Sequence, residues 1–95
     1  RKNNVITMKK KVSLVERYAI EKVKAKRLAA KMTPGQLSRR LGIDSSFVAH
    51  VESDNYMDKY NLNHLNAIAI ILQCSIKEFI PRSPLVDENT KYIFR

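Results

Sequence analysis

The sequence predicts a single all-α domain, a compact bundle of five helices. Apolar side chains recur at spacings of three and four residues in several segments, which is the pattern of helices with one buried face. Each segment follows a residue that caps helices well, namely Ser13, Thr33, Asp44, Asn61 and Ser75. The connections between the segments are short, which favours neighbouring helices that pack on each other.

The first helix is expected to begin after Ser13, because Glu16 stands three residues later and completes a capping box. It should end before Thr33, where the next cap begins. Its expected apolar stripe consists of Leu14, Tyr18, Ala19, Val23, Ala25, Leu28, Ala29 and Met32. Basic side chains cover its remaining faces, namely Lys22, Lys24, Lys26, Arg27 and Lys31.

Residues 33–52 read as two short helices joined by a tight turn. Thr33 and Gln36 form a capping box around Pro34, whose missing N–H needs no partner at a first helical position. Gly42 supplies a left-handed residue that ends this helix, and Asp44 is expected to cap the next one. The expected buried positions are Leu37, Leu41, Phe47, Val48 and Val51. Helix, glycine-containing turn and helix together indicate a helix-turn-helix.

A fourth helix is expected after Asn61, and a short fifth helix after Ser75, which forms the pattern S-x-x-E with Glu78 and ends at Pro81. The expected buried side of the fourth helix consists of Leu62, Leu65, Ile68, Ala69 and Leu72, and the fifth helix should carry Ile76, Phe79 and Ile80. The domain then spans residues 13–81, between a basic arm (1–12) and a tail (82–95). The tail can remain mobile, can complete a dimer, or can form a β-strand in which residues 92–94 pair with residues 5–8.

The positive charge is concentrated in the first part of the chain. The net charge is +9, and residues 1–40 hold 13 Lys and Arg against two Glu, whereas residues 41–95 hold 5 basic and 7 acidic groups. This distribution is typical of a protein with a polyanionic partner, although a solvated basic helix face is the simpler alternative. The single Cys74, the absence of a membrane-spanning run and the absence of a secretory signal favour a cytoplasmic protein.

Other chemistries find little support. His50, His64 and Cys74 lack the spacing of metal ligands, and Gly35 and Gly42 do not form a phosphate-binding loop. The acidic groups are scattered, so no carboxylate pair is expected to perform acid–base catalysis. We therefore expect neither an enzyme nor a cofactor or metal.

Four sequence motifs in order, KAKRLAAKM, QLSRRLGID, FVAHVES and LNAIAIILQCSIKEFI, resemble the Cro and phage-repressor (Xre-type) helix-turn-helix family over residues 16–80. The resemblance implies a lambda-repressor-like five-helix bundle that binds double-stranded DNA. It implies a structural ion pair between Arg27 and Glu52 as well. We accordingly expect a small, sequence-specific transcriptional regulator that acts as a homodimer.

In this family the second helix of the motif reads base edges. If its apolar residues face inward, helical geometry turns Ser45, Ser46, Ala49 and His50 outward, and these are the candidate base contacts. The candidate phosphate contacts are Arg39 and Arg40 on the first motif helix, Thr33 at its N-terminus, Lys9, Lys10 and Lys11 in the arm, and Asn61.

Two departures from the family pattern favour an alternative. Pro34 occupies the place of a glutamine that commonly contacts DNA, and Asp54 and Asp58 fall where they would face phosphates. The alternative is a protein-interaction module, antitoxin-like or a mobile-element accessory, that keeps the fold with little DNA binding. Its partner would dock on the tail or on a patch formed by Tyr56, Met57 and Tyr60, although these three side chains can instead cover the core.

Overall fold

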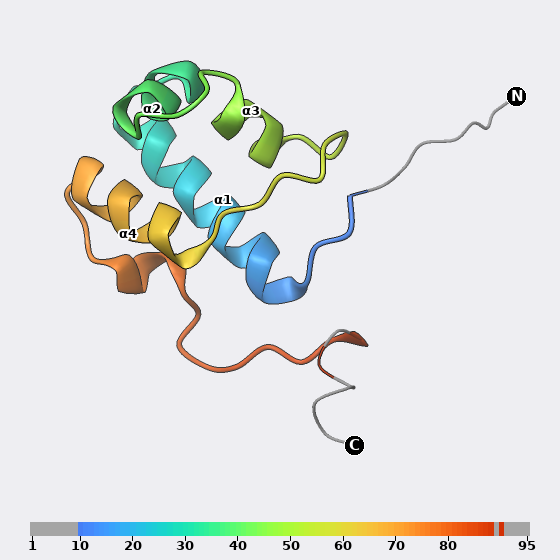
Figure 1. The fold of residues 1–95 in the computed structure, drawn as a ribbon. Helices are drawn as coiled ribbons and strands as arrows, with labels where there is room; N and C mark the ends of the chain where they lie inside the picture. Colours follow the sequence, from blue (N-terminus) through green and yellow to red (C-terminus); the bar gives the residue numbers. More distant parts are fainter. Residues whose placement is uncertain (1–9, 89, 91–95) are drawn as a thin grey trace, which may run out of the picture.

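The computed structural model describes residues 10–88 and 90, which form four α-helices and one 3₁₀ helix and contain no strand in that part of the chain (Figure 1). The elements are α1 (Leu14–Ala29), α2 (Pro34–Arg40), α3 (Phe47–Glu52), α4 (Leu62–Ile71) and η2 (Ile76–Phe79). The all-α prediction is confirmed, but the fifth helix is only a 3₁₀ turn of four residues. Both segments of the predicted strand pair, 5–8 and 92–94, lie outside the described residues.

Three helices begin at the predicted caps. The Ser13 hydroxyl accepts a hydrogen bond from the Glu16 amide at 3.2 Å, and the Glu16 carboxylate accepts one from the Ser13 amide at 2.8 Å. Thr33 and Gln36 make the same reciprocal pair at the start of α2. Asn61 caps α4: its side-chain oxygen accepts from the His64 amide, and the ring nitrogen Nδ1 of His64 accepts from the Asn61 amide. Each box satisfies amides that a helix leaves unpaired at its first turn.

One other predicted cap, Asp44, was wrong, and Ser75 caps its helix without the predicted capping box. The Asp44 carboxylate accepts hydrogen bonds from the amide and the hydroxyl of Ser46, at 2.8 and 2.6 Å, which closes a turn two residues long. As a result α3 begins only at Phe47. The Ser75 hydroxyl accepts from the Lys77 amide, and Glu78 turns away to pair with Lys26 at 2.7 Å, so no capping box forms there.

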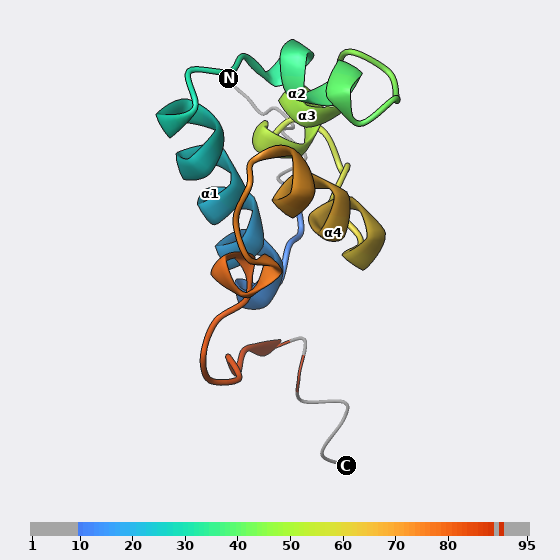
Figure 2. The ribbon, with the colours of Figure 1, turned by 90° about the vertical axis from the view of Figure 1, so that its left-hand side faces the viewer.

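The core lies where α1, α2, α3, α4 and η2 meet, and Figure 2 shows α2 and α3 together at one end of the molecule. The buried apolar residues are Ile20, Val23, Leu37, Val48, Val51, Leu65, Ile68, Ala69 and Phe79. Leu14, Leu28 and Leu62 were predicted on buried faces but are 51, 56 and 66% exposed. In α1 the buried face passes through Ile20, Val23 and Arg27, and this turns Leu28 outward.

The ion pair that the resemblance implied is present, and it is deeply buried. The side chains of Arg27 and Glu52 are only 6 and 9% exposed. The guanidinium donates through Nε and Nη2 to the two carboxylate oxygens of Glu52 at 2.9 and 2.8 Å, and through Nη1 to the carbonyl oxygen of Met32 at 2.7 Å. A single arginine thereby joins the end of α1, the turn before α2 and the end of α3.

Glu52→Gln should lower the free energy of unfolding by about 3 kcal/mol, because it leaves the buried Arg27 charge without a counter-ion. The matched control is Asp54→Asn, which breaks a pair whose Arg17 and Asp54 side chains are 34 and 74% exposed. That change should cost less than about 1 kcal/mol. Urea unfolding measures both. Equal losses in the two variants would contradict a special role for the buried pair.

Candidate nucleic-acid interface

The turn between α2 and α3 reverses the chain through one left-handed residue. Gly42 has φ of 75°, as the sequence predicted, and its amide donates to the Arg39 carbonyl at 2.9 Å. The next amide, of Ile43, donates to the Ser38 carbonyl at 3.2 Å. These two bonds satisfy carbonyls at the end of α2 and direct the chain toward α3.

Ser38 fixes α3 against α2. Its side chain is fully buried, and its hydroxyl donates to the Pro34 carbonyl at 2.9 Å while it accepts from the Val48 amide at 3.0 Å. The Val48 amide lies in the first turn of α3, where a helix leaves its amides without internal partners. Sequence reasoning missed this residue. The available signal was its place beside Leu37 on the inward face of a short helix.

The outer side of α3 and of the turn before it carries small side chains. Ser45 and Ala49 are exposed, and Ser46 and His50 are partly exposed. The Ser46 hydroxyl is engaged with Asp44, and the two hydrogen bonds from Ser46 hold the pKa of Asp44 below its ordinary value. The His50 ring stacks on the Tyr56 ring, with centroids 3.8 Å apart and planes 15° apart. Ser45 and Ala49 are therefore the most accessible residues of this face.

Arg39 and Arg40 are both exposed and line one hollow of about 480 Å³ together with Lys31. The other lining residues, Ala30, Met32 and Gln36, are uncharged, so the hollow holds three positive groups and no acid. A Cβ atom built on Gly35 would lie 3.5 Å from Nη1 of Arg39 and 3.7 Å from the carbonyl oxygen of Ser45. The basic hollow thus adjoins the turn that leads into α3. Thr33, at the start of α2, is exposed but holds the Gln36 amide.

The predicted cations of the arm have different environments. Lys10 was predicted as a phosphate contact, but it is only 8% exposed, and its ammonium donates to the carbonyl oxygens of Val51 and Ser53 at 2.5 and 3.4 Å. The Lys10 ammonium therefore already has acceptors within the protein. Lys11 is exposed, and Lys9 lies outside the described residues. Asn61 is exposed, and its side-chain oxygen caps α4.

The loop between α3 and α4 divides into exposed and covered residues. Tyr56 and Met57 are 47 and 50% exposed. Tyr60 instead packs against the core, with its ring edge-on to that of Phe47 at 5.9 Å, and burial raises the pKa of Tyr60 well above its usual range. Of the three aromatic and apolar residues in the predicted patch, Tyr60 therefore covers the core. Asp54 is paired with Arg17 at 3.2 Å.

The arrangement offers positive charge close to a helix face with short side chains, which suits a polyanion with an accessible groove. Within residues 10–88 and 90, no three His, Cys, Asp or Glu side chains gather in a way that could hold a metal ion. No helix in this described part has the length and apolar composition needed to cross a membrane.

Comparison with known protein families gives one finding. The family model of the Cro/C1-type HTH DNA-binding domain matches residues 22–84, which include the second half of α1 and all of α2, α3, α4 and η2. No curated protein and no solved structure matches the chain.

Ser38→Ala should lower the free energy of unfolding by about 1–3 kcal/mol, because it leaves the buried Val48 amide without an acceptor. The exposed Ser45→Ala is the control and should change stability by less than about 0.5 kcal/mol. Amide hydrogen exchange should become faster at Val48 in the Ser38 variant only. An unchanged exchange rate at this amide would show that the hydroxyl does not hold α3.

Proposed function

The chain belongs to the Cro/C1-type helix-turn-helix DNA-binding family, and from this premise we propose that it binds double-stranded DNA sequence-specifically and regulates transcription. The observation that supports the proposal is the position of Arg39 and Arg40. Both are exposed beside the turn into α3, and neither is paired with an acid among the described residues. In this proposal residues 13–81 are the DNA-binding domain, with residues 1–12 as its arm and residues 82–95 as its tail.

Base contacts come from the outer side of the α3 region. Ser45, Ser46, Ala49 and His50 carry this role in the proposal, and α3 is the recognition helix. Serine bonds to almost any base, alanine contacts the thymine methyl group, and none of these residues is a bidentate reader such as Arg, Asn or Gln. One recognition helix therefore discriminates weakly between DNA sequences.

Phosphate contacts supply most of the affinity. Arg39 and Arg40 contact the DNA backbone in this proposal, and Thr33, Asn61, Lys9 and Lys11 are the further candidates for phosphate contacts. Pro34 offers no side-chain donor where many relatives have one, so the arginines carry a larger share. The logarithm of the binding constant should fall linearly with the logarithm of the salt concentration, because each neutralised phosphate releases counterions.

A homodimer compensates for the weak sequence discrimination of one recognition helix. Two copies that present α3 one helical turn of DNA apart, about 34 Å, read two half-sites at once. The free-energy difference between the right and wrong sequences is then counted twice. The operator expected from this arrangement is a palindrome with half-sites about 10 base pairs apart.

A protein-interaction role is the second candidate, and the exposure of Met57 and Tyr56 favours it. In this reading the fold serves as a platform for a protein partner that covers the loop after α3. Met57→Ser separates the two functions, because Met57 is absent from the proposed DNA face. Loss of a co-purifying protein with unchanged DNA affinity would support the interaction role, and recovery of no partner would count against it.

The decisive experiment is selection of bound duplexes from a random pool, repeated at two salt concentrations. The proposed function predicts enrichment of a palindromic motif that becomes sharper at the higher salt, where non-specific binding is weakened. Absence of binding to any duplex at the lower salt would overturn the proposal. Binding without enrichment would overturn its sequence-specific part.

Arg39→Ala should weaken binding to all duplexes alike and reduce the salt slope by about 1, because it removes one phosphate contact. His50→Ala should instead change the preference among sequences and leave the slope unchanged. Arg82→Ala, an exposed arginine beyond η2, is the charge-matched control and should leave both quantities as in the parent. Fluorescence anisotropy with the selected duplex and a scrambled duplex measures all three. Indistinguishable Arg39 and Arg82 variants would place the phosphate face elsewhere.

A further inference from the structure

The C-terminal end of α3 is completed by a residue from far away in the sequence. The helix has six residues, and its last carbonyl groups have no partner within the helix. The chain leaves it in an extended conformation at Ser53, with φ of −93° and ψ of 142°, so no left-handed cap closes this end. Lys10 supplies the missing donors, through its ammonium hydrogen bonds to the carbonyl oxygens of Val51 and Ser53.

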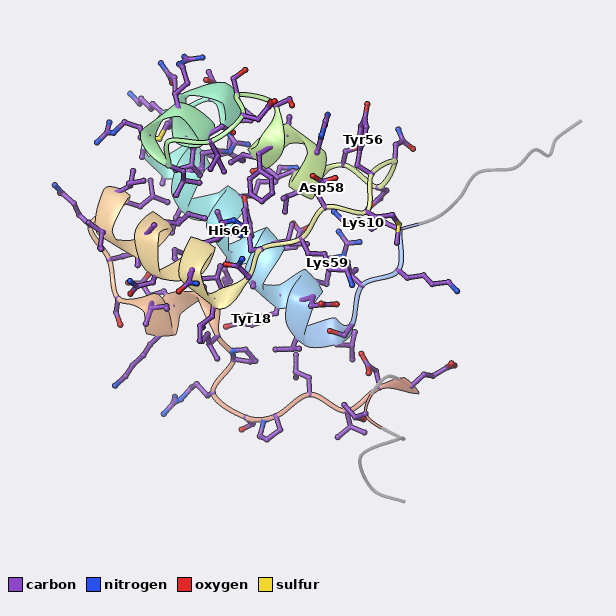
Figure 3. All side chains as sticks on the ribbon, viewed as in Figure 1. Lys10, Tyr18, Tyr56, Asp58, Lys59 and His64 are labelled. Carbon is purple, nitrogen blue, oxygen red and sulfur yellow. The ribbon has the colours of Figure 1, made fainter. Side chains whose placement is uncertain are left out.

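Lys10 is held there by its main chain as well. Its backbone amide donates to the carbonyl oxygen of Asp54 at 3.3 Å. Figure 3 shows Lys10 beside Asp58, on the side of the molecule where the loop after α3 passes. Burial lowers the pKa of Lys10 and Arg17 lowers it further, whereas Asp58 and Asp54 act in the opposite direction. The two acids therefore favour the ammonium form at the helix end, where positive charge is stabilised by the helix dipole.

Three contacts then hold α3. Ser38 binds the amide of Val48 near its start, and Arg27 binds the Glu52 side chain near its end. Lys10 is the contact that acts on the backbone carbonyls at the C-terminus. A helix of six residues is too short to keep its direction by its own hydrogen bonds. External contacts at both ends therefore set the angle at which its outer face is presented.

We propose that Lys10 is a positioning residue, which orients the recognition helix α3 for DNA and does not itself contact phosphate. The inference rests on the proposed function for the meaning of that orientation. An ammonium that contacts phosphate must be accessible, whereas the Lys10 ammonium is buried and hydrogen-bonded to two carbonyl oxygens. The adjacent Lys11 has the same charge and is exposed, so it provides a matched comparison.

The test uses Lys10→Met, which keeps the length of the side chain but removes its charge and donors, and Lys11→Met as the control. Affinity is measured at four salt concentrations for the selected duplex and for a scrambled one. Lys10→Met should lower affinity for the selected duplex about tenfold more than for the scrambled duplex, with an unchanged salt slope. Lys11→Met should lower both affinities equally and reduce the slope by about 1, as expected for the loss of a phosphate contact.

A slope that falls by about 1 in the Lys10 variant would show a phosphate contact and overturn the inference. Equal losses on the two duplexes would overturn it too. If Lys10→Met does not fold, Lys10→Gln replaces it, since this variant keeps a donor on a slightly shorter side chain and removes the charge. It should lose part of the discrimination at a constant slope, and a reduced slope or full discrimination would again overturn the inference.

A separate readout distinguishes this failure from failure of the proposed function. If the parent protein binds no duplex, the proposed function fails, but the mechanical part of the inference remains testable by amide hydrogen exchange. The amides of residues 50–53, at the end of α3, should exchange faster in Lys10→Met than in Lys11→Met. The two variants are compared under conditions in which their free energies of unfolding are equal. Identical exchange in the two variants would show that Lys10 does not hold the helix.

Discussion

The buried contact of Arg27 with Glu52 determines how the rest of the fold is arranged. Removing two charges from water costs several kcal/mol per ion, so the pair contributes little net stability relative to apolar residues of the same size. Its contribution is geometric, because the planar guanidinium meets both carboxylate oxygens and the Met32 carbonyl in fixed directions. These directions set the end of α3 relative to α1 and fix the turn from which α2 begins.

The shortness of α3 explains why so many of its neighbours bind its backbone. A helix with six residues gains little from its own hydrogen bonds, and its outer face has only small or flat side chains to offer a groove. A larger reader could tolerate a few degrees of misalignment by changing rotamer. The side chains of serine and alanine are too short for this, so in the proposed function the precision of contact has to come from the scaffold. Ser38, Arg27 and Lys10 provide it from three directions.

The contacts that could be predicted from the sequence are those between two residues within one helical turn of each other. Ser13, Thr33 and Asn61 cap their helices with residues three positions later, so spacing alone was sufficient. The late start of α3 was missed, because Asp44 can close either a helix or a two-residue turn and only packing of Phe47 and Val48 decides. Lys10 and Val51 are 41 residues apart, and no local pattern reports that contact. The surface placement of Arg39 followed from helix periodicity, whereas the burial of Ser38 depends on a partner from the next helix.

Internal pairing also changes the electrostatic argument against DNA binding. Acidic residues after α3 would repel phosphates if their charge were exposed, at a cost of about 1 kcal/mol each by Coulomb's law. Asp54, however, lies against Arg17, and the Lys10 ammonium is the near neighbour of both Asp54 and Asp58. On the other side of the motif, Arg39, Arg40 and Lys31 surround a hollow whose lining includes no acid. Repulsion is therefore compensated within the protein on the acidic side, while attraction stays uncompensated on the basic side. In the proposed function this imbalance directs the DNA to α2 and the turn before α3.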